Sequence, residues 1–158
     1  MASTSDRAAG RRGRIPALAL VVSFVGAVVL AGCSSAAGGT VKVTLTEWAV
    51  VTDKASIPAG DVTFDVTNAG TQFKHEFVVM KTDLAPDAMP ADSTGKVNEE
   101  ATGVANVGET GDMDIGANKT LKINLKAGKY VLMCNIVEAA GNHESHFQKG
   151  MKIAFTVS

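Results

Sequence analysis

Six stretches of the chain have the hydrophobic pattern of β-strands. In five of them apolar side chains alternate with polar ones, as in a strand with one face in a core. These five stretches are 41–46, 62–66, 75–79, 121–125 and 151–157. The sixth, 130–133, is a short apolar run with aromatic and β-branched side chains. The pattern therefore predicts a chain built mainly from short strands.

Turns rich in Gly, Pro and Asn separate these strands, and nothing in the chain resembles a βαβ unit. Short alternating strands divided by such turns predict an all-β antiparallel sandwich. The segment 83–116 differs, because it is rich in Asp, Glu, Gly and Ala and has few apolar runs. We expect it to be a long loop-rich insertion, with a short helix at most near 84–88 or 98–102.

Side chains that bind metals gather in the last third of the chain. Cys134 ends the apolar run, His143 and His146 lie in the loop after it, and Met151 begins the last predicted strand. Another histidine, His75, opens a strand earlier in the chain. Cys and Met are soft ligands that suit copper, and two His with one Cys and a weak axial Met define a blue-copper centre. The residues therefore predict one copper ion, with the choice between the two loop histidines open.

Three sequence features resemble those of the cupredoxin family of blue copper proteins, which includes plastocyanin and azurin. They are the turn Asn68-Ala69-Gly70 before His75, the position of Tyr130 four residues before Cys134, and the four residues between His146 and Met151. The resemblance covers 41–158 and is greatest to plastocyanin-type members. It implies a cupredoxin-like Greek-key β-sandwich of seven to eight strands.

The resemblance also implies a ligand set and a role. His75, Cys134 and His146 would bind the copper ion in a trigonal set, and Met151 would be the weak axial ligand. The protein would be a mononuclear type 1 copper protein that carries single electrons by cycling between Cu(I) and Cu(II). Backbone N–H groups near Asn68 and Glu76 are expected to orient the thiolate. Glu76 stands where plastocyanin-like chains often have Asn, and a carboxylate aimed at the site would favour Cu(II).

The segment between Cys134 and the second histidine departs from the plastocyanin-type pattern. Eleven residues separate Cys134 from His146, whereas plastocyanin-type chains have a much shorter segment. His143 could also reach an ion bound by Met151, since an extended chain spans over 3 Å per residue. We expect His146 to be the ligand, because a shorter connection to Met151 costs less ordering entropy and holds the imidazole more firmly.

The chain has only three histidines, and this number limits its chemistry. Copper nitrite reductases and multicopper oxidases need additional His-rich sites, and no Ser–His–Asp or paired-carboxylate motif stands out. We therefore expect no enzymatic activity. Two alternatives stay open. The first is a copper-binding and delivery protein, which would use the long Gly-containing loop to exchange metal. The second is an interaction module that binds no metal, and in that case the metal-site pattern of His75 and Cys134 would be a coincidence.

The N-terminus has the features of a bacterial lipoprotein leader. Arg11, Arg12 and Arg14 directly precede an apolar run that is too short for a comfortable membrane span, and the run ends in Leu30-Ala31-Gly32-Cys33. This sequence resembles a lipobox, with Cys33 as the acylated residue. We expect 1–32 to be a signal peptide, 33–40 a lipidated cysteine and flexible tether, and 41–158 the folded domain. An ordinary signal peptide or an uncleaved anchor is the alternative.

The predicted processing determines location, charge and partners. Lipid on Cys33 would anchor the exported protein to the outer face of a bacterial membrane, as in a periplasm. Removal of 1–32 takes away all four arginines and leaves a net charge of about −4, which argues against nucleic acid as a partner. Cys134 would be the only free thiol, and metal binding explains an unpaired cysteine in an exported protein. The expected partners are redox proteins of an extracytoplasmic electron-transfer chain.

Overall fold

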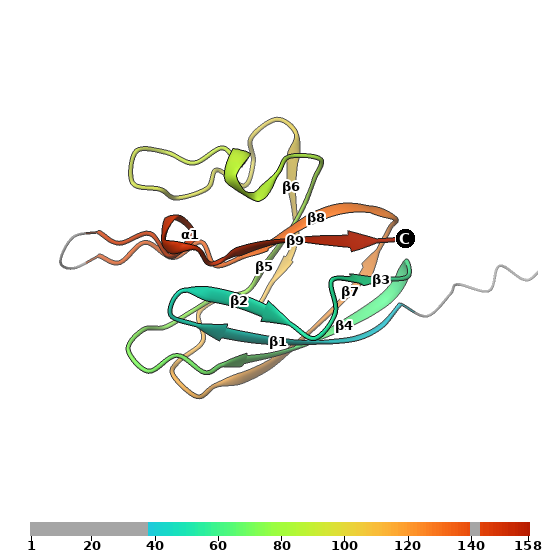
Figure 1. Cartoon of the computed structure of the whole chain (residues 1–158), viewed down its shortest axis with the longest axis horizontal. Helices are drawn as coiled ribbons and strands as arrows, with labels where there is room; N and C mark the ends of the chain where they lie inside the picture. The colour runs from blue at the N-terminus through green and yellow to red at the C-terminus, as the bar shows by residue number, and fades with distance from the viewer. Residues whose placement is uncertain (1–37, 140–142) are drawn as a thin grey trace, which may run out of the picture. The chain divides into compact units, whose positions relative to one another are not determined.

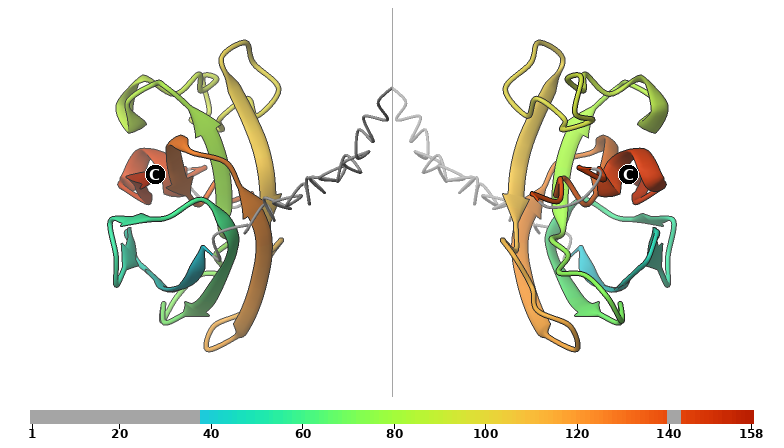
Figure 2. Two further views of the ribbon diagram at one scale, coloured as in Figure 1. Left: turned by 90° about the vertical axis from the view of Figure 1, so that its right-hand side faces the viewer. Right: turned by 90° about the vertical axis from the view of Figure 1, so that its left-hand side faces the viewer.

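The computed structural model describes residues 38–139 and 143–158, which form two β-sheets packed face to face (Figures 1 and 2). The first sheet has four strands in the order β2, β1, β4, β7, and the second has five in the order β3, β9, β8, β5, β6. In the first sheet the strands are β2 (Ala49–Thr52), β1 (Gly39–Thr46), β4 (Gly60–Asn68) and β7 (Asn118–Leu125). In the second they are β3 (Ser56–Ile57), β9 (Lys152–Val157), β8 (Gly128–Met133), β5 (Val78–Thr82) and β6 (Val104–Glu109). This is the all-β sandwich that the hydrophobic pattern predicts, although two strand pairs, β1 with β4 and β3 with β9, are parallel and not antiparallel.

The chain passes repeatedly from one sheet to the other, as in a Greek-key sandwich. β1 pairs with β4 in parallel, with Val41 opposite Phe64, and β4 pairs with β7 in antiparallel register. In the second sheet β8 pairs in antiparallel with both β5 and β9. The last strand therefore lies beside the strand that ends at the cysteine, which brings residues before β9 close to residues after β8.

The main core lies between the sheets, where alternate side chains of both sheets meet. Phe64 packs against Phe77 and Phe155, with ring centroids 5.1 and 6.1 Å apart. Alternation in β1 and β4 fills this core from the first sheet, and Tyr130 and Leu132 of β8 with Phe155 and Val157 of β9 fill it from the second. The polar alternates face outward, so the period of two in the sequence is the period of burial.

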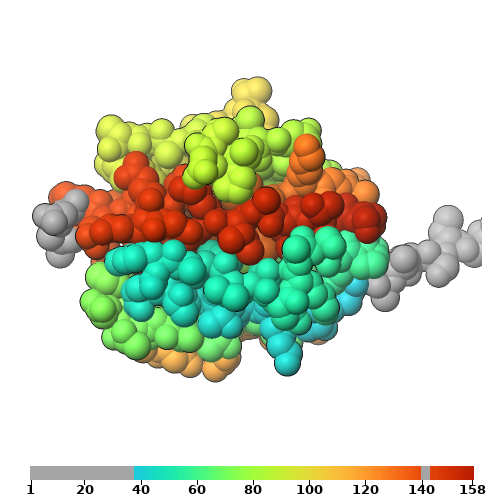
Figure 3. Space-filling model, viewed as in Figure 1, coloured from blue at the N-terminus to red at the C-terminus, as the bar shows by residue number. Residues whose placement is uncertain are grey.

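A second, smaller core lies on the outer face of the five-stranded sheet. Val78, Met80, Val131 and Met133 project to this face and pack against Met89, Val97 and Phe147. β5 and β8 are therefore buried on both faces, which explains why 130–133 is a continuous apolar run. Figure 3 shows the red C-terminal segment as a band between the cyan residues of the first strands and the yellow-green residues of the segment before β6.

The structure corrects three details of the sequence prediction. The described residues form nine strands rather than seven to eight, because short β2 and β3 strands add to the sheet edges. The segment 83–116 contains an unexpected strand, β6, whereas its 3₁₀ helix, Pro86–Ala88, confirms the short helix expected near 84–88. β6 was missed because it is an edge strand with no fully buried residue. The strand expected at 75–79 begins only at Val78, and His75 pairs with Met113 in an isolated bridge.

The predicted leader, Cys33 and most of the predicted tether lie outside the described residues. The last two residues of the predicted tether, Gly39 and Thr40, already belong to β1. No helix among the residues that the structure describes has the length and apolar character to cross a membrane.

Candidate metal centre

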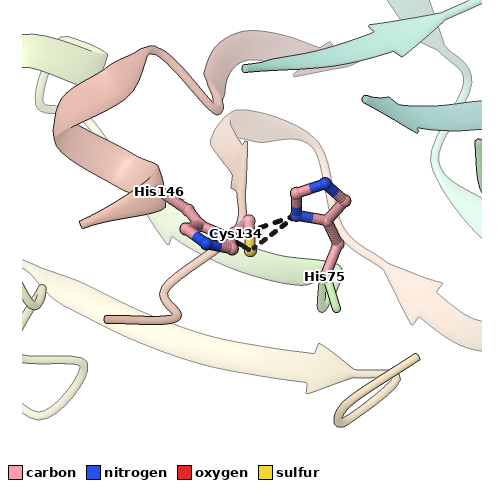
Figure 4. Close-up of side chains that lie close together, drawn as sticks. All are labelled: His75, Cys134 and His146. Atoms are coloured by element: carbon pink, nitrogen blue, oxygen red, sulfur yellow. Dashed lines mark hydrogen bonds between the residues drawn. The ribbon is translucent and has the colours of Figure 1, made fainter. Parts of the chain in front are cut away.

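Three side chains with metal-binding atoms meet at one end of the sandwich, and none is exposed to solvent (Figure 4). His75 comes from the loop between β4 and β5, Cys134 directly follows β8, and His146 begins the short helix α1, His146–Lys149. Their donor atoms all lie within 4.8 Å of one another. They form the only such group of three or more His, Cys, Asp or Glu side chains in the described part of the chain.

The distances within this group suit a single metal ion. Nδ1 of His75 is 3.1 Å from Nδ1 of His146, and Sγ of Cys134 is 3.9 and 3.4 Å from these two atoms. Nitrogen and sulfur donors bound about 2.0–2.3 Å from one ion in a trigonal plane stand roughly 3.6–3.8 Å apart. The three donors therefore need only small adjustments to bind one ion. Two imidazoles, one thiolate and a nearby thioether are the donor set of a type 1 copper site.

The loop that carries His75 is tied to the sandwich by backbone and amide hydrogen bonds. His75 exchanges two backbone hydrogen bonds with Met113, of 3.2 and 2.7 Å. The Asn68 amide donates to the carbonyls of Met113 and Phe73 and accepts from the N–H of Gly70. A Cβ on Gly70 would come within 2.9 Å of Nε2 of His75, so this turn needs glycine to place the ring.

Cys134 is positioned by the pairing of the last two strands. Its N–H donates to the carbonyl of Met151 at 3.0 Å, and its Sγ accepts the N–H of Glu76 at 3.4 Å. The expected backbone donor near Glu76 is therefore present, whereas the backbone N–H groups of Asn68 and Ala69 donate to the carbonyls of Ala117 and Leu45 and not to the sulfur. Burial raises the pKa of the Cys134 thiol to about 12, so the metal-free site holds a thiol and a cation must displace its proton.

His146 lies at the start of α1, whose ends are defined by local hydrogen bonds. The Ser145 hydroxyl accepts the N–H of Gln148 and donates to the carbonyl of Gly95. Gly150 ends the helix with φ of 124°, which a residue with a side chain rarely adopts. This capped turn holds His146 in the group, whereas His143 is exposed and lies outside it.

Met151 lies beside the other two predicted ligands of the C-terminal part. Its N–H donates to the carbonyl of His146, and its carbonyl accepts the N–H of Cys134. The side chain is fully buried in the same core cluster as Cys134. The structure therefore brings the donor atoms of His75, Cys134 and His146 together and places Met151 next to two of these residues.

Burial keeps both imidazoles neutral. It lowers the pKa of His75 to about 4, helped by the neighbouring His146 and opposed by Glu47. The pKa of His146 is also lowered by burial, although the nearby Glu138 opposes this. Neutral imidazoles have free lone pairs for a metal at physiological pH. The Nδ1–Nδ1 contact of 3.1 Å accommodates one proton in the metal-free chain, and a metal ion would replace it.

Two glutamates and two aromatic residues surround the histidines and were not predicted from the sequence. Trp48 and Phe73 pack edge-on against the His146 ring, with centroids 5.1 and 5.6 Å away. Oε1 of Glu138 is 3.1 Å from Nε2 of His146, and Oε1 of Glu47 is 3.8 Å from Nε2 of His75. No periodicity or motif links these residues to the ligands, so the sequence held no signal for them.

Glu76 lies behind the cysteine rather than in the metal-binding group. Its Oε1 accepts the N–H of Asn135 at 3.1 Å, next in the chain after Cys134. Burial raises the pKa of Glu76 to about 7, and nearby carboxylates including Glu109 and Glu99 add to this although the Asn135 N–H lowers it. The predicted carboxylate thus lies against the backbone that follows Cys134, and its pKa is raised to about 7.

Comparisons with known proteins identify the fold. No protein-family model matches the chain, and no curated protein sequence gives a significant match. Reduced auracyanin from Roseiflexus castenholzii is 23% identical with a TM-score of 0.53, and the match covers 77% of this chain and 98% of that one.

Two further solved structures agree. Auracyanin A, a "blue" copper protein from Chloroflexus aurantiacus, is 16% identical with a TM-score of 0.51 over 77% of this chain and all of that one. The azurin Az-iso2 from Methylomonas sp. strain J is 18% identical with a TM-score of 0.50 over 77% and 99% of the two chains. Identities this low establish the fold alone. The chain is an all-β two-sheet sandwich with a cupredoxin-like fold.

Proposed function

We propose that this protein is a mononuclear type 1 copper protein that carries single electrons. The observation that carries the proposal is the buried group of His75, Cys134 and His146, whose donor atoms converge on one point. These three residues would bind copper in a trigonal set, with Met151 as the weak axial ligand. Bound copper would supply the Cu(I)/Cu(II) couple. The structural similarity to auracyanin A, a blue copper protein, supports this assignment.

The surroundings of the site favour electron transfer over catalysis. All three donors are fully buried, so the site presents no open face to a substrate. The ligands are attached to paired strands and a capped turn, which would hold nearly the same geometry in both oxidation states. The remaining histidine, His143, is exposed and outside the group, and the described residues contain no second group of metal-binding side chains. The protein is therefore proposed to be a carrier and not an enzyme.

The alternative role in copper delivery receives less support. It depends on a loosely held second histidine, which could leave the ion easily. Instead, His146 has a backbone hydrogen bond to Ile136, a capped turn around it and a carboxylate on Nε2. These contacts favour a ligand that stays bound. Redox proteins of an extracytoplasmic electron-transfer chain remain the proposed partners.

Export and lipid attachment at Cys33 complete the proposal. The leader-like sequence 1–32 and its Leu30-Ala31-Gly32-Cys33 end support anchoring to the outer face of a bacterial membrane. Acyl chains would hold the protein at the membrane, since stable anchoring takes more than one chain. Lipid labelling of Cys33 is the measurement that tests this part.

A visible and EPR spectrum of the copper-loaded protein tests the central proposal. We expect an intense absorption from charge transfer between the Cys134 thiolate and Cu(II). Cys134→Ser and His146→Ala should each remove this absorption, and His143→Ala, the matched control, should keep it. Absorption that survives Cys134→Ser, or that is lost in His143→Ala alone, would show that the assignment is wrong.

A further inference from the structure

The long segment between Cys134 and His146 folds back on itself where the structure describes it. Val137 and Ser145 form an antiparallel bridge, and the N–H of Glu138 donates to the carbonyl of Glu144 at 3.0 Å. The N–H of His146 donates to the carbonyl of Ile136 at 2.9 Å. The two arms therefore run side by side, and the outgoing arm places Glu138 next to the histidine that ends the returning arm.

Glu138 makes a direct contact with the His146 ring. Its Oε1 lies 3.1 Å from Nε2 of His146. A carboxylate only accepts hydrogen bonds, so the contact places the imidazole proton on Nε2. Nδ1 is then left with its lone pair, and it faces Sγ of Cys134 at 3.4 Å and Nδ1 of His75 at 3.1 Å. The contact therefore selects the tautomer that a metal ion at this point needs.

Glu138 is the partner that the structure gives to Nε2 of His146. The ring is fully buried, and the two rings that pack edge-on against it, Trp48 and Phe73, are largely apolar. The other histidine of the group differs. Nε2 of His75 is buried with no hydrogen-bond partner, and the nearest carboxylate, Glu47, is 3.8 Å away. The two histidines thus differ at Nε2: that of His146 has a carboxylate partner, and that of His75 has none.

We propose that Glu138 is a positioning residue for the metal site, and that the long segment between Cys134 and His146 serves to place it there. Glu138 holds the His146 ring in orientation and tautomer, and its negative charge favours Cu(II) over Cu(I). Carboxylates that accept the second N–H of a ligating histidine act this way in metal sites generally. The inference rests on the proposed copper function, because it assigns a role to a residue around that site.

Two substitutions separate the hydrogen bond from the charge. Glu138→Gln keeps a side-chain acceptor for Nε2–H but removes the charge, whereas Glu138→Ala removes both. Glu144→Gln is the matched control, because it removes one negative charge from the returning arm and its carboxylate pairs with Lys149 at 2.8 Å instead of with His146. Thermal unfolding of each metal-free variant shows whether the fold is retained.

The first measurement needs no copper. Long-range ¹⁵N–¹H spectra of the metal-free protein at neutral pH report the tautomer of each histidine. We expect His146 to have its proton on Nε2 in the wild type, Glu138→Gln and Glu144→Gln, and a mixture of tautomers in Glu138→Ala. A wild-type-like His146 spectrum in a folded Glu138→Ala variant would overturn the positioning role.

The second measurement uses the copper-loaded protein. We expect Glu138→Ala to lower Cu(II) affinity about 10–100-fold, the range seen for such supporting residues, and Glu138→Gln to lower it less. Both should raise the reduction potential by more than Glu144→Gln does. Equal potentials in Glu138→Gln and Glu144→Gln would overturn the charge role. A wild type that binds copper without a blue spectrum would refute the proposed function, and the metal-free tautomers would still decide the role of Glu138.

Discussion

At the scale of single residues, the metal-free site holds neutral groups that are ready for a cation. Burial raises the pKa of the Cys134 thiol to about 12 and lowers that of His75 to about 4. Between these values the thiol keeps its proton and the imidazole stays neutral. A bound metal ion would stabilise the buried thiolate, which gives a reason for an unpaired cysteine between two histidines.

Glu76 is expected to make the reduction potential depend on pH. Burial raises its pKa to about 7, and its carboxylate lies against the backbone that follows Cys134. An ionised carboxylate stabilises Cu(II) more than Cu(I), so the potential should fall as pH rises through about 7. Glu76→Gln should flatten this dependence in cyclic voltammetry.

A control for this prediction is Asp65→Asn, which removes an exposed carboxylate from the other sheet, where it accepts a hydrogen bond from Thr120. This variant should keep the pH dependence of the wild type. A potential that still falls through neutral pH in Glu76→Gln would assign the effect to another group.

At the scale of elements, the site is held together by strands and turns that are far apart in the sequence. The turn between β1 and β2 carries Glu47, whose carboxylate accepts the N–H groups of Thr71, Gln72 and Phe73 at 3.0–3.2 Å. These residues belong to the loop that leads to His75. The turn between β1 and β2 therefore secures the loop between β4 and β5.

Glu47 is expected to contribute stability that is lost in acid. Burial opposes ionisation, but the backbone hydrogen bonds from Gln72, Thr71 and Phe73 outweigh it and lower the pKa of Glu47 from 4.5 to about 2. A lowered native pKa means that the contribution is present above pH 4.5 and is lost as pH falls toward 2. Glu47→Gln should unfold at a lower temperature than the wild type at neutral pH, and the difference should shrink in this acid range.

The measurement is thermal unfolding of the metal-free protein as a function of pH. Glu100→Gln, which changes an exposed glutamate, should follow the wild-type curve. A constant difference between Glu47→Gln and the wild type across the acid range would show that ionisation of Glu47 is not the cause.

The elements also show where prediction from sequence succeeds. β1, β4, β7, β8 and β9 were predicted because each shows a long apolar alternation or run against a buried face. β6 was not, since its residues are at most half-buried at a sheet edge. The start of β5 was wrong by three residues, because the buried alternation continues through His75 and Phe77 although the strand pairing begins at Val78.

At the scale of the whole folded domain, the candidate site lies at the end opposite the start of β1. β1 begins at Gly39 and leads to Trp48, which contacts His146. Its eight residues extend about 26 Å at about 3.3 Å per residue. In Figure 1 the C-terminus lies at the end of the sandwich away from α1. A partner could therefore approach the site from the end away from the first described residues.

The proposed lipid anchor gives a test at this scale. Cys33→Ala should abolish labelling by a radioactive fatty acid and shift the protein from the membrane fraction to the soluble fraction after export. Cys134→Ala is the control, and it should keep the lipid while losing copper. Unchanged labelling in Cys33→Ala would exclude this residue as the lipid site.

The strands that build the core and the residue types of the metal site follow from the sequence alone. Burial on one face of a strand imposes a period of two, and this local pattern can be read without knowing the partner strand. The soft donors Cys134 and Met151 and the few histidines could likewise be recognised by their chemistry.

Which residues surround these donors depends on how the chain packs in three dimensions. Glu47, Trp48 and Phe73 reach the histidines for two reasons. β1 pairs with β4, and Phe73 in the loop before β5 packs against His146 at the start of α1. Glu138 reaches His146 because two arms of one loop pair. Contacts between residues far apart in the chain depend on how the sheets and loops pack, and no periodic pattern of burial marks them in the sequence.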